Sequence, residues 1–282
     1  MSVREEDRST LPERGIVLAA TPLGNPLDAS PRLKEALASA PLVAAEDTRR
    51  ARALAEALGV TIAGKVVSHF DHNEASRAPE LLQAARLGPV LVVTDAGMPV
   101  VSDPGLGLVD AAHEAGLPVT CLPGPSAVTT AIALSGLKVG GFIFDGFAPR
   151  KPGPKRRWLE GLKEERRAAC FFESPHRIEE TLRLAEEVLG GERRVAVCRE
   201  LTKTHEEVWR GPLSRAAAWA AGARGEITVV VDGARPGPPS VELLAERARE
   251  LAEREGLRLK DACKRVAEGT GVANRDVYNA AQ

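Results

Sequence analysis

The feature that most restricts the fold of this chain is a regular alternation of short apolar, β-branched runs with longer amphipathic segments. The apolar runs predict strands at residues 16–20, 42–45, 66–68, 90–94 and 118–122. Helices are expected between them at residues 31–40, 48–58, 75–87 and 104–115. Because these strands are apolar along their whole length, they favour a mainly parallel sheet with helices on both faces.

A second set of elements follows the Pro-Gly-Pro segment at residues 123–125. Strands are expected at residues 142–144, 168–172, 194–198 and 227–232, and helices at residues 126–135, 155–162, 176–189 and 213–221. Asp103-Pro104 and Ser174-Pro175 have the composition of helix starts, and Ser126 is expected to cap the helix after it.

These patterns predict an α/β protein built from two α/β domains and a helical extension. The predicted parts are a disordered N-terminal tail at 1–14, an N-terminal α/β domain at 15–124, a C-terminal α/β domain at 125–234 and a helical, helix-turn-helix-like extension at 241–282. The Pro- and Gly-rich residues 234–240 are expected to link the last two parts. Three amphipathic helices are expected in the extension, at 241–255, 259–269 and 273–281.

The composition indicates a soluble protein of the cytoplasm. The first residues lack the apolar stretch of a secretory signal, and no apolar run is long enough to span a bilayer, so no membrane partner is expected. The 4 cysteines lie far apart and predict buried thiols rather than a zinc site or disulfides. No metal is expected.

The net charge of −1 argues against a protein that binds nucleic acid over its whole surface. Residues 150–167 are an exception, because they contain eight Lys or Arg residues against three Glu residues. This segment is either a solvated helix face or a surface that contacts phosphates. Trp158 within it is expected either to stack on a base or to lie in the core.

Polar residues collect where the strands of the first set end. Thr21–Asn25, Glu46–Arg49, Ser68–Glu74 and Thr94–Pro99 each follow one of these strands. Ligands of open parallel sheets bind outside the carboxyl ends of the strands, so the four segments together predict a site. The chain has no phosphate-binding GxxxxGK[ST] motif, and Ser126 lacks the GxSxG frame of a nucleophile.

Eight segments together closely resemble the family of ribosomal RNA small subunit methyltransferase I, the 2′-O-ribose cytidine methylase branch of the tetrapyrrole methylase superfamily. They are ATPLGN (20–25), AAEDTRR (44–50), DHNE (71–74), TDAGMPVVSDPG (94–105), LPGPSAVTTAIALSGL (122–137), FAPRK (147–151), FESPHRI (172–178) and RELTKTHEEVWRG (199–211). The resemblance spans residues 16–233 in order. Met98 departs from it, since the family commonly has Thr there.

The resemblance implies that S-adenosylmethionine binds in the cleft between two α/β domains. It places the cofactor against Pro22, Asp95, Ala96, Gly97, Ser126, Ala127, Phe172, Leu201 and Ile227. It implies methylation of a ribose 2′-hydroxyl of a decoding-centre cytidine in 16S rRNA, with the 30S ribosomal subunit as partner. A homodimer is usual for the superfamily.

The residues that activate the 2′-hydroxyl and those that bind RNA can be narrowed only to two groups of candidates. A group that polarises the 2′-hydroxyl is expected among Glu46, Asp47, Asp71, His72, Lys203, His205 and Glu206, with Glu46, Asp47, His72 and Lys203 preferred. RNA contacts are expected from Arg49, Asn73, Arg150, Lys151, Arg156 and Arg177, with Lys155 and Arg157 beside them. Glu46 could instead form a structural ion pair with Arg49 or Arg177.

Two other functions remain open at this point. One is a methyltransferase of the same superfamily that acts on a tetrapyrrole carbon or on the modified histidine of an elongation factor. The other is an RNA-binding assembly factor that has kept the fold and lost catalysis. The ESPHR and RELTKTHEE segments argue against the first function, and the intact loops at 94–99 and 124–127 argue against the second.

Overall fold

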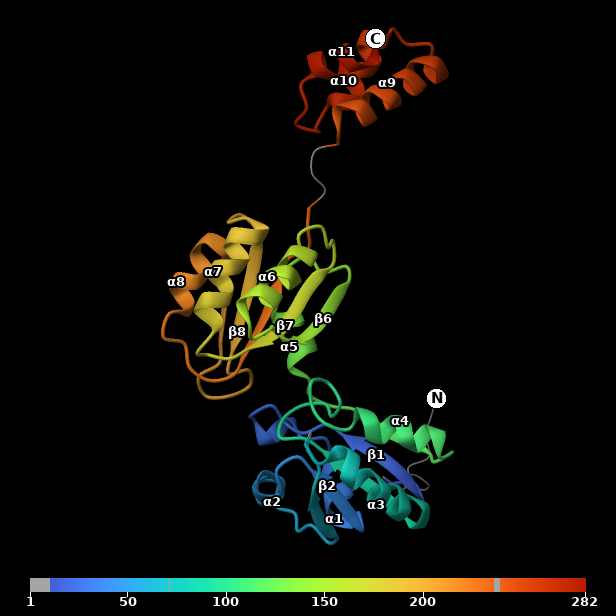
Figure 1. The fold of residues 1–282 in the computed structure, drawn as a ribbon, viewed down its shortest axis with the longest axis vertical. Coiled ribbons are helices and arrows are strands. Elements are labelled where there is room, and N and C mark those ends of the chain that lie inside the picture. The colour runs from blue at the N-terminus through green and yellow to red at the C-terminus, as the bar shows by residue number, and fades with distance from the viewer. Residues whose placement is uncertain (1–10, 71, 236–238) are drawn as a thin grey trace. The chain divides into compact units, whose positions relative to one another are not determined.

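A computed structural model describes residues 11–70, 72–235 and 239–282 of the chain (Figure 1). Most of the tail predicted at 1–14 lies outside these ranges; of its described residues, Leu11 packs into a hydrophobic core. Contacts divide the chain into a large compact unit, Met1–Gly233, and a small one, Ala234–Gln282.

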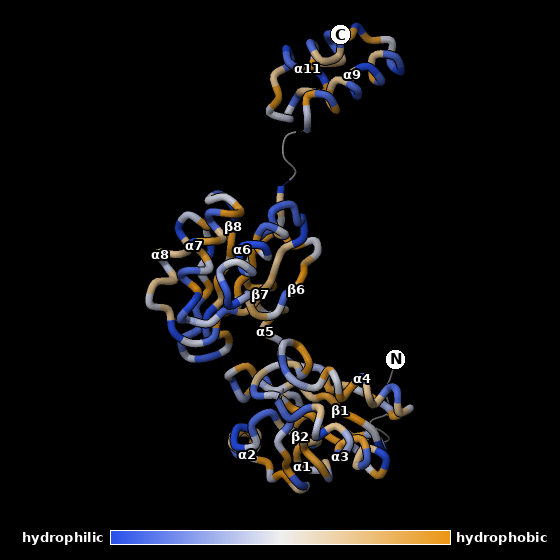
Figure 2. The backbone as a smooth tube through the Cα atoms, viewed as in Figure 1, coloured by the Kyte–Doolittle hydropathy of each residue, from blue (hydrophilic) through white to orange (hydrophobic). Residues whose placement is uncertain are grey.

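The first sheet of the large unit is wholly parallel, as the apolar strands predict. Its strands are β1 (Gly15–Ala19), β2 (Leu42–Ala45), β3 (Lys65–Ser68), β4 (Pro89–Val93) and β5 (Val119–Leu122), in the order β3-β2-β4-β1-β5. Each begins and ends within about one residue of its predicted bounds. The sheet strands appear mainly in the hydrophobic colours of Figure 2.

Helices cover both faces of this sheet because side chains alternate between the faces along each strand. Helices α1 (Pro31–Ser39) and α2 (Thr48–Ala57) share one core with Val17, Val43 and Leu91. Helices α3 (Glu74–Leu87) and α4 (Leu106–Glu114) share the other core with Ile16 and Val90. A short 3₁₀ turn, η2 (Pro26–Asp28), follows β1.

The second sheet is mixed rather than mainly parallel. Its strands are β6 (Phe142–Phe147), β7 (Ala168–Glu173), β8 (Arg194–Arg199), β9 (Glu207–Pro212) and β10 (Ile227–Val231), in the order β6-β7-β10-β8-β9. Only the β6–β7 pair is parallel. The short connection 200–206 joins β8 to β9 as a hairpin, which forces antiparallel pairing. The sequence pattern missed β9 because this edge strand is polar and contains Gly and Pro.

Helices also cover both faces of the second sheet. Helix α5 (Ala127–Ser135) packs on one face, and α6 (Pro152–Gly161), α7 (Ile178–Leu189) and α8 (Leu213–Ala220) pack on the other. Trp158 of α6 meets Phe171 edge-on at 4.9 Å between ring centroids, and its indole N–H donates to Asp145 at 2.8 Å. Trp158 is therefore partly buried, with its ring packed against the core and its N–H paired within the protein.

Two predicted helix starts are wrong. Helix α4 begins at Leu106, beyond Asp103-Pro104, because the Glu74 carboxylate accepts from the backbone N–H groups of Gly105 at 3.2 Å and Leu108 at 3.1 Å. The segment after Ser174 first makes a turn, in which the Ser174 hydroxyl accepts from a backbone N–H, and α7 begins only at Ile178. The starts of α4 and α7 both depend on hydrogen bonds that the local sequence pattern does not predict.

The small unit is a bundle of three helices with its own core, as predicted for the extension. The helices are α9 (Val241–Glu255), α10 (Leu259–Ala267) and α11 (Asn274–Ala281). Within the described ranges, no helix has the length and apolar character needed to cross a bilayer. All strands of the first sheet end by Leu122 and those of the second begin at Phe142, while the domain boundary at 124 stays a prediction.

Candidate active site

A cavity of about 320 Å³ lies at the carboxyl ends of the first sheet's strands, where the polar segments predicted a site. Residues after β2 and β4 line one side of it, and residues of α5, β7 and β10 line the other. Its size falls in the range of small-molecule sites in proteins. Of the nine residues predicted to bind a cofactor, seven line this cavity: Asp95, Ala96, Gly97, Ser126, Ala127, Phe172 and Ile227. Pro22 and Leu201 are not among the lining residues.

The loop after β4 forms much of the cavity wall in an unusual backbone conformation. Gly97 has a φ of +84° and exchanges two backbone hydrogen bonds with Thr21, at 2.9 and 3.0 Å. Val100 and Ser102 also have positive φ values, 74° and 66°, which are strained for residues with a side chain. Strain of this kind persists where the surrounding structure holds it, often at a binding site.

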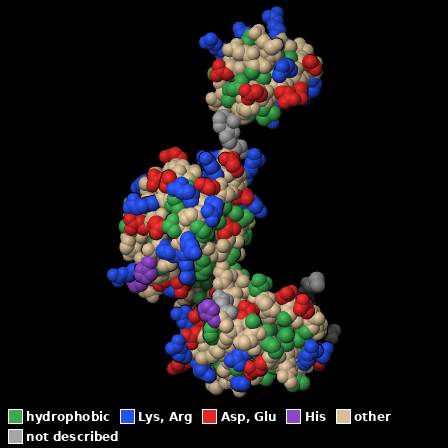
Figure 3. All heavy atoms as spheres, viewed as in Figure 1, with side chains coloured by type: hydrophobic (Ala, Val, Ile, Leu, Met, Phe, Trp, Pro, Cys, Tyr) green, Lys and Arg blue, Asp and Glu red, His purple; other side chains and the backbone are tan. Residues whose placement is uncertain are grey.

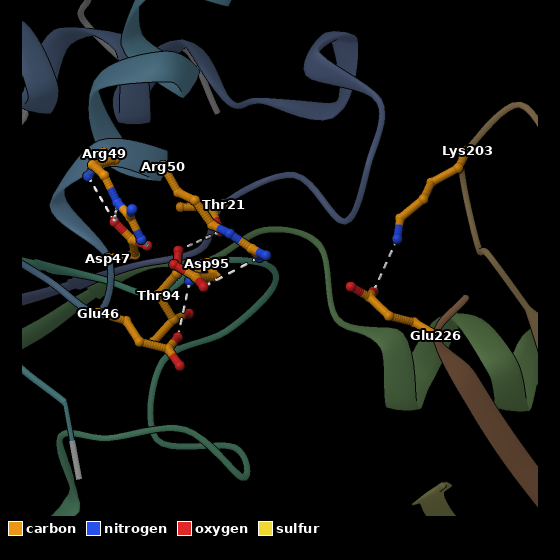
Figure 4. Close-up of polar contacts among 9 residues, drawn as sticks. All are labelled: Thr21, Glu46, Asp47, Arg49, Arg50, Thr94, Asp95, Lys203 and Glu226. Carbon is orange, nitrogen blue, oxygen red and sulfur yellow. Dashed lines mark hydrogen bonds and ion pairs between the residues drawn. The ribbon is translucent and has the colours of Figure 1, made fainter. Parts of the chain in front are cut away.

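Three charged residues meet at one side of the cavity (Figure 4). The backbone N–H of Asp95 donates to Glu46 Oε2 at 3.1 Å, and Arg50 Nη1 lies 3.2 Å from Asp95 Oδ2. Burial raises the pKa of Asp95, while the positive charge of Arg50 opposes that rise. The sequence analysis singled out Asp47 for the chemistry and Arg49 for RNA contact, but it did not single out Arg50.

Asp47 and Arg49 pair with each other instead of lining the cavity. Asp47 accepts from the backbone N–H of Arg49 at 2.8 Å and so caps α2, and its second oxygen lies 2.7 Å from Arg49 Nη2. Hydrogen bonds from Arg49 lower the pKa of Asp47. Of the four preferred candidates for the chemistry, only Glu46 therefore lines the cavity.

The segment after β3 is organised by Asn73. Its side-chain oxygen accepts from the backbone N–H of Phe70 at 2.8 Å, and its nitrogen donates to the Ser68 carbonyl at 3.2 Å. His72 is exposed and meets the Phe70 ring edge-on, and Asp71 lies outside the described residues. His69 is 1% exposed, and burial lowers its pKa. Asn73 is therefore engaged in holding its own loop.

Lys203 lies in the tight loop between β8 and β9. Its ammonium is 2.9 Å from Glu200 Oε1 and 3.2 Å from Glu226 Oε2, and Glu226 lines the cavity (Figure 4). Its stem covers Gly24, where an added Cβ would overlap with Lys203 Cγ. Lys203 thus contacts a lining residue, Glu226, but does not itself line the cavity. The other two broader candidates in this loop, His205 and Glu206, are exposed.

A buried polar network supports the wall formed by the end of β7. Glu173 accepts from Thr181 Oγ1 at 2.7 Å and pairs with Arg177 at 2.6 Å. The ammonium of Lys155, which is fully buried, donates to Thr181 Oγ1 at 3.0 Å and pairs with Glu180. The expectation that Lys155 contacts RNA is therefore wrong, and Arg177 is paired inside the protein.

Two of the predicted RNA contacts are open to solvent beside the cavity. Arg150 and Lys151 are exposed and form no ion pair with any residue that the structure describes, whereas Arg156 pairs with Glu187 at 2.8 Å. Phe147, 58% exposed, lines the cavity and packs edge-on against Phe172. Elsewhere basic and acidic side chains are interspersed on the visible face (Figure 3). Phe147 lies in the segment FAPRK, from which the sequence analysis selected Arg150 and Lys151 as RNA contacts and did not select Phe147.

A family model described as tetrapyrrole (corrin/porphyrin) methylases matches residues 15–217. Curated proteins called ribosomal RNA small subunit methyltransferase I are similar along almost the whole chain. That of Mycobacterium tuberculosis is 57% identical over 94% of this chain and 93% of its own length, and that of Synechocystis is 39% identical over 93% and 95%.

Solved structures are similar in fold at low sequence identity. The methyltransferase CobJ is 23% identical, with a TM-score of 0.59 over 80% of this chain and 98% of its own. A uroporphyrin-III C-methyltransferase from Thermus thermophilus, complexed with S-adenosylhomocysteine, is 18% identical, with a TM-score of 0.55 over 78% and 97%.

Proposed function

The chain belongs to the tetrapyrrole methylase family, and we propose that it transfers a methyl group from S-adenosylmethionine to the 2′-hydroxyl of a cytidine ribose in 16S rRNA. Membership confirms the family predicted from the sequence motifs. The observation that carries the proposal is the cavity at the strand ends, since seven of the nine residues predicted for the methyl donor line it. The rRNA acceptor is supported by relatives of 57% and 39% identity that are named for it.

The cavity suits a donor that has an apolar part and a charged part. Phe172, Ile227 and Val128 supply apolar surface for an adenosine, and Glu46 and Asp95 supply carboxylates for the positive groups of the donor. Gly97 lines the cavity and has no side chain of its own, so the donor can come close to its backbone. S-adenosylmethionine supplies the methyl group, bound to a sulfonium that makes it electrophilic.

The reaction forms a C–O bond to the ribose while the C–S bond breaks, and the hydroxyl proton leaves to a base or to water. The residues of the cavity would hold both reactants in line, which contributes much of the rate in such displacements. Glu46 is the favoured group for accepting or polarising the hydroxyl proton, because its carboxylate lines the cavity and accepts a hydrogen bond from the backbone N–H of Asp95, which holds it there.

RNA reaches the cavity, in this proposal, across the segment that contains Phe147, Arg150 and Lys151. Exposed cations bind phosphates, and an exposed aromatic ring can stack on an unpaired base. Phe147 stands at the cavity, and the cations follow it within four residues. Charge reversal at Arg150 and Lys151 is expected to weaken rRNA binding in a salt-dependent way without changing donor affinity.

We further propose that the acceptor lies in the decoding centre of the 30S subunit, that the protein acts in the cytoplasm, and that it is a homodimer.

Transfer of tritiated methyl groups tests the proposal. Donor, protein and 30S subunits from a strain lacking the enzyme are incubated, and the labelled nucleotide is mapped. Label on ribose is expected, recognised by resistance of the adjacent phosphodiester to alkali. Label on a base would refute the 2′-hydroxyl as acceptor. Absence of label on either free 16S rRNA or 30S subunits, with label on a tetrapyrrole, would favour another member of the family.

A further inference from the structure

The charges around the cavity are unequal in number. Its lining contains five acidic side chains, Glu46, Asp95, Asp103, Glu173 and Glu226. Among the described residues that line it, Arg50 is the one Lys or Arg. The proposed methyl donor has the reverse arrangement, with two positive groups, the sulfonium and the ammonium, and one carboxylate. The single carboxylate of the donor and the single cation of the lining therefore correspond.

Arg50 and Asp95 differ in how firmly they are held. Asp95 lies two residues after the end of β4, its backbone N–H donates to Glu46, and its side chain is 24% exposed. Arg50 lies in the first turn of α2, and its side chain is 64% exposed. An ion pair with so much solvent around it is weak, so a ligand can separate its partners at little cost.

We infer that Arg50 and Asp95 together bind the amino-acid end of the donor, the guanidinium taking its carboxylate and the Asp95 carboxylate taking its ammonium. This inference rests on the proposed function. A zwitterion inserted between the two side chains replaces one ion pair by two, each with the correct sign. Arginine suits this role because its planar fork matches a carboxylate.

The placement also orients the rest of the donor. With the amino-acid end at Arg50, the adenosine is directed to the apolar wall at Phe172 and Ile227, and the sulfonium lies between them, near acidic side chains. The backbone N–H groups at the start of α5 are the competing partner for the carboxylate, since Ser126 does not cap them with its side chain.

Calorimetric titration with two probes tests the inference. S-adenosylhomocysteine has the amino-acid end, whereas 5′-methylthioadenosine has the same adenosine and thioether without it. Arg50→Met is expected to raise the Kd for S-adenosylhomocysteine about 10- to 100-fold, the loss expected for a charge-assisted hydrogen bond. The Kd for 5′-methylthioadenosine should change less than about twofold. Arg52→Met, the same substitution two residues further along α2 and outside this cavity, should leave both values unchanged.

Two results would count against this assignment. Equal weakening of both probes by Arg50→Met would mean that Arg50 only shapes the cavity. An unchanged Kd for S-adenosylhomocysteine would place the carboxylate elsewhere, at the start of α5 for example. Either result overturns the inference while leaving the methyl donor in place. Failure of the unaltered protein to bind either probe would instead refute the proposed function.

Discussion

Replacing Thr181 with Val should destabilise the large unit far more than the removal of one exposed hydroxyl would. The Thr181 hydroxyl is fully buried and makes two hydrogen bonds to charged groups, 3.0 Å from Lys155 Nζ and 2.7 Å from Glu173 Oε2. Valine has nearly the same shape and makes neither bond. A hydrogen bond to a charged group contributes about 1.5–3 kcal/mol to stability. A buried polar group that is left without its partner also destabilises the protein by the free energy of its desolvation.

Both charged groups keep other partners, which reduces the expected loss. Lys155 keeps Glu180, whose side chain is 64% exposed, and Glu173 keeps Arg177 and a backbone N–H. We therefore expect a loss of about 3 kcal/mol. For a unit of this size, that loss corresponds to a fall in Tm of about 6–12 °C.

Thermal unfolding followed by calorimetry measures this loss, and Thr181→Ser is the matched control. Serine keeps the hydroxyl and should cost less than about 1 kcal/mol. In a double-mutant cycle with Lys155→Met, the two substitutions should couple by about 1–2 kcal/mol because the residues share a bond. A loss below about 0.5 kcal/mol for Thr181→Val, or equal losses for Val and Ser, would refute the reasoning.

Three further predictions concern other parts of the large unit. Gly24→Ala should lower the free energy of unfolding by about 1–3 kcal/mol, because the added methyl group overlaps with the Lys203 stem, and by less than about 1 kcal/mol in a Lys203→Ala background. Equal losses in both backgrounds would contradict the contact. Burial lowers the pKa of His69, so below the ordinary histidine pKa of about 6.5 the unfolded chain takes up the proton first, and the free energy of unfolding decreases as the pH is lowered. Urea titrations of His69→Gln should show a smaller decrease between about pH 7 and 5. A decrease as large as in the unaltered protein would refute this. Burial raises the pKa of Cys170 to about 12, so mass spectrometry after alkylation of the native protein should find label first on half-buried Cys121, and early labelling of Cys170 would contradict its burial.

The elements and the general place of the site follow from the sequence alone. The period of apolar residues is a local property, and it located all the strands except β9, whose polar edge sequence lacks that period. Continuous apolar character predicted the parallel first sheet. Polar segments after its strands predicted the cavity, because the carboxyl ends of parallel strands meet at one edge.

The tertiary structure alone decided which of these polar groups face the cavity and which are buried. Arg49 and Arg50 are neighbours on α2, where successive side chains point about 100° apart, so the docking of the helix determines that Arg50 reaches Asp95 while Arg49 pairs with Asp47. Lys155 reads as a surface cation in a basic segment, but Thr181 and Glu180 of α7 supply the partners that let it be buried. A local pattern cannot contain such partners, because they come from residues distant in sequence and the free energy of a charged group depends on them.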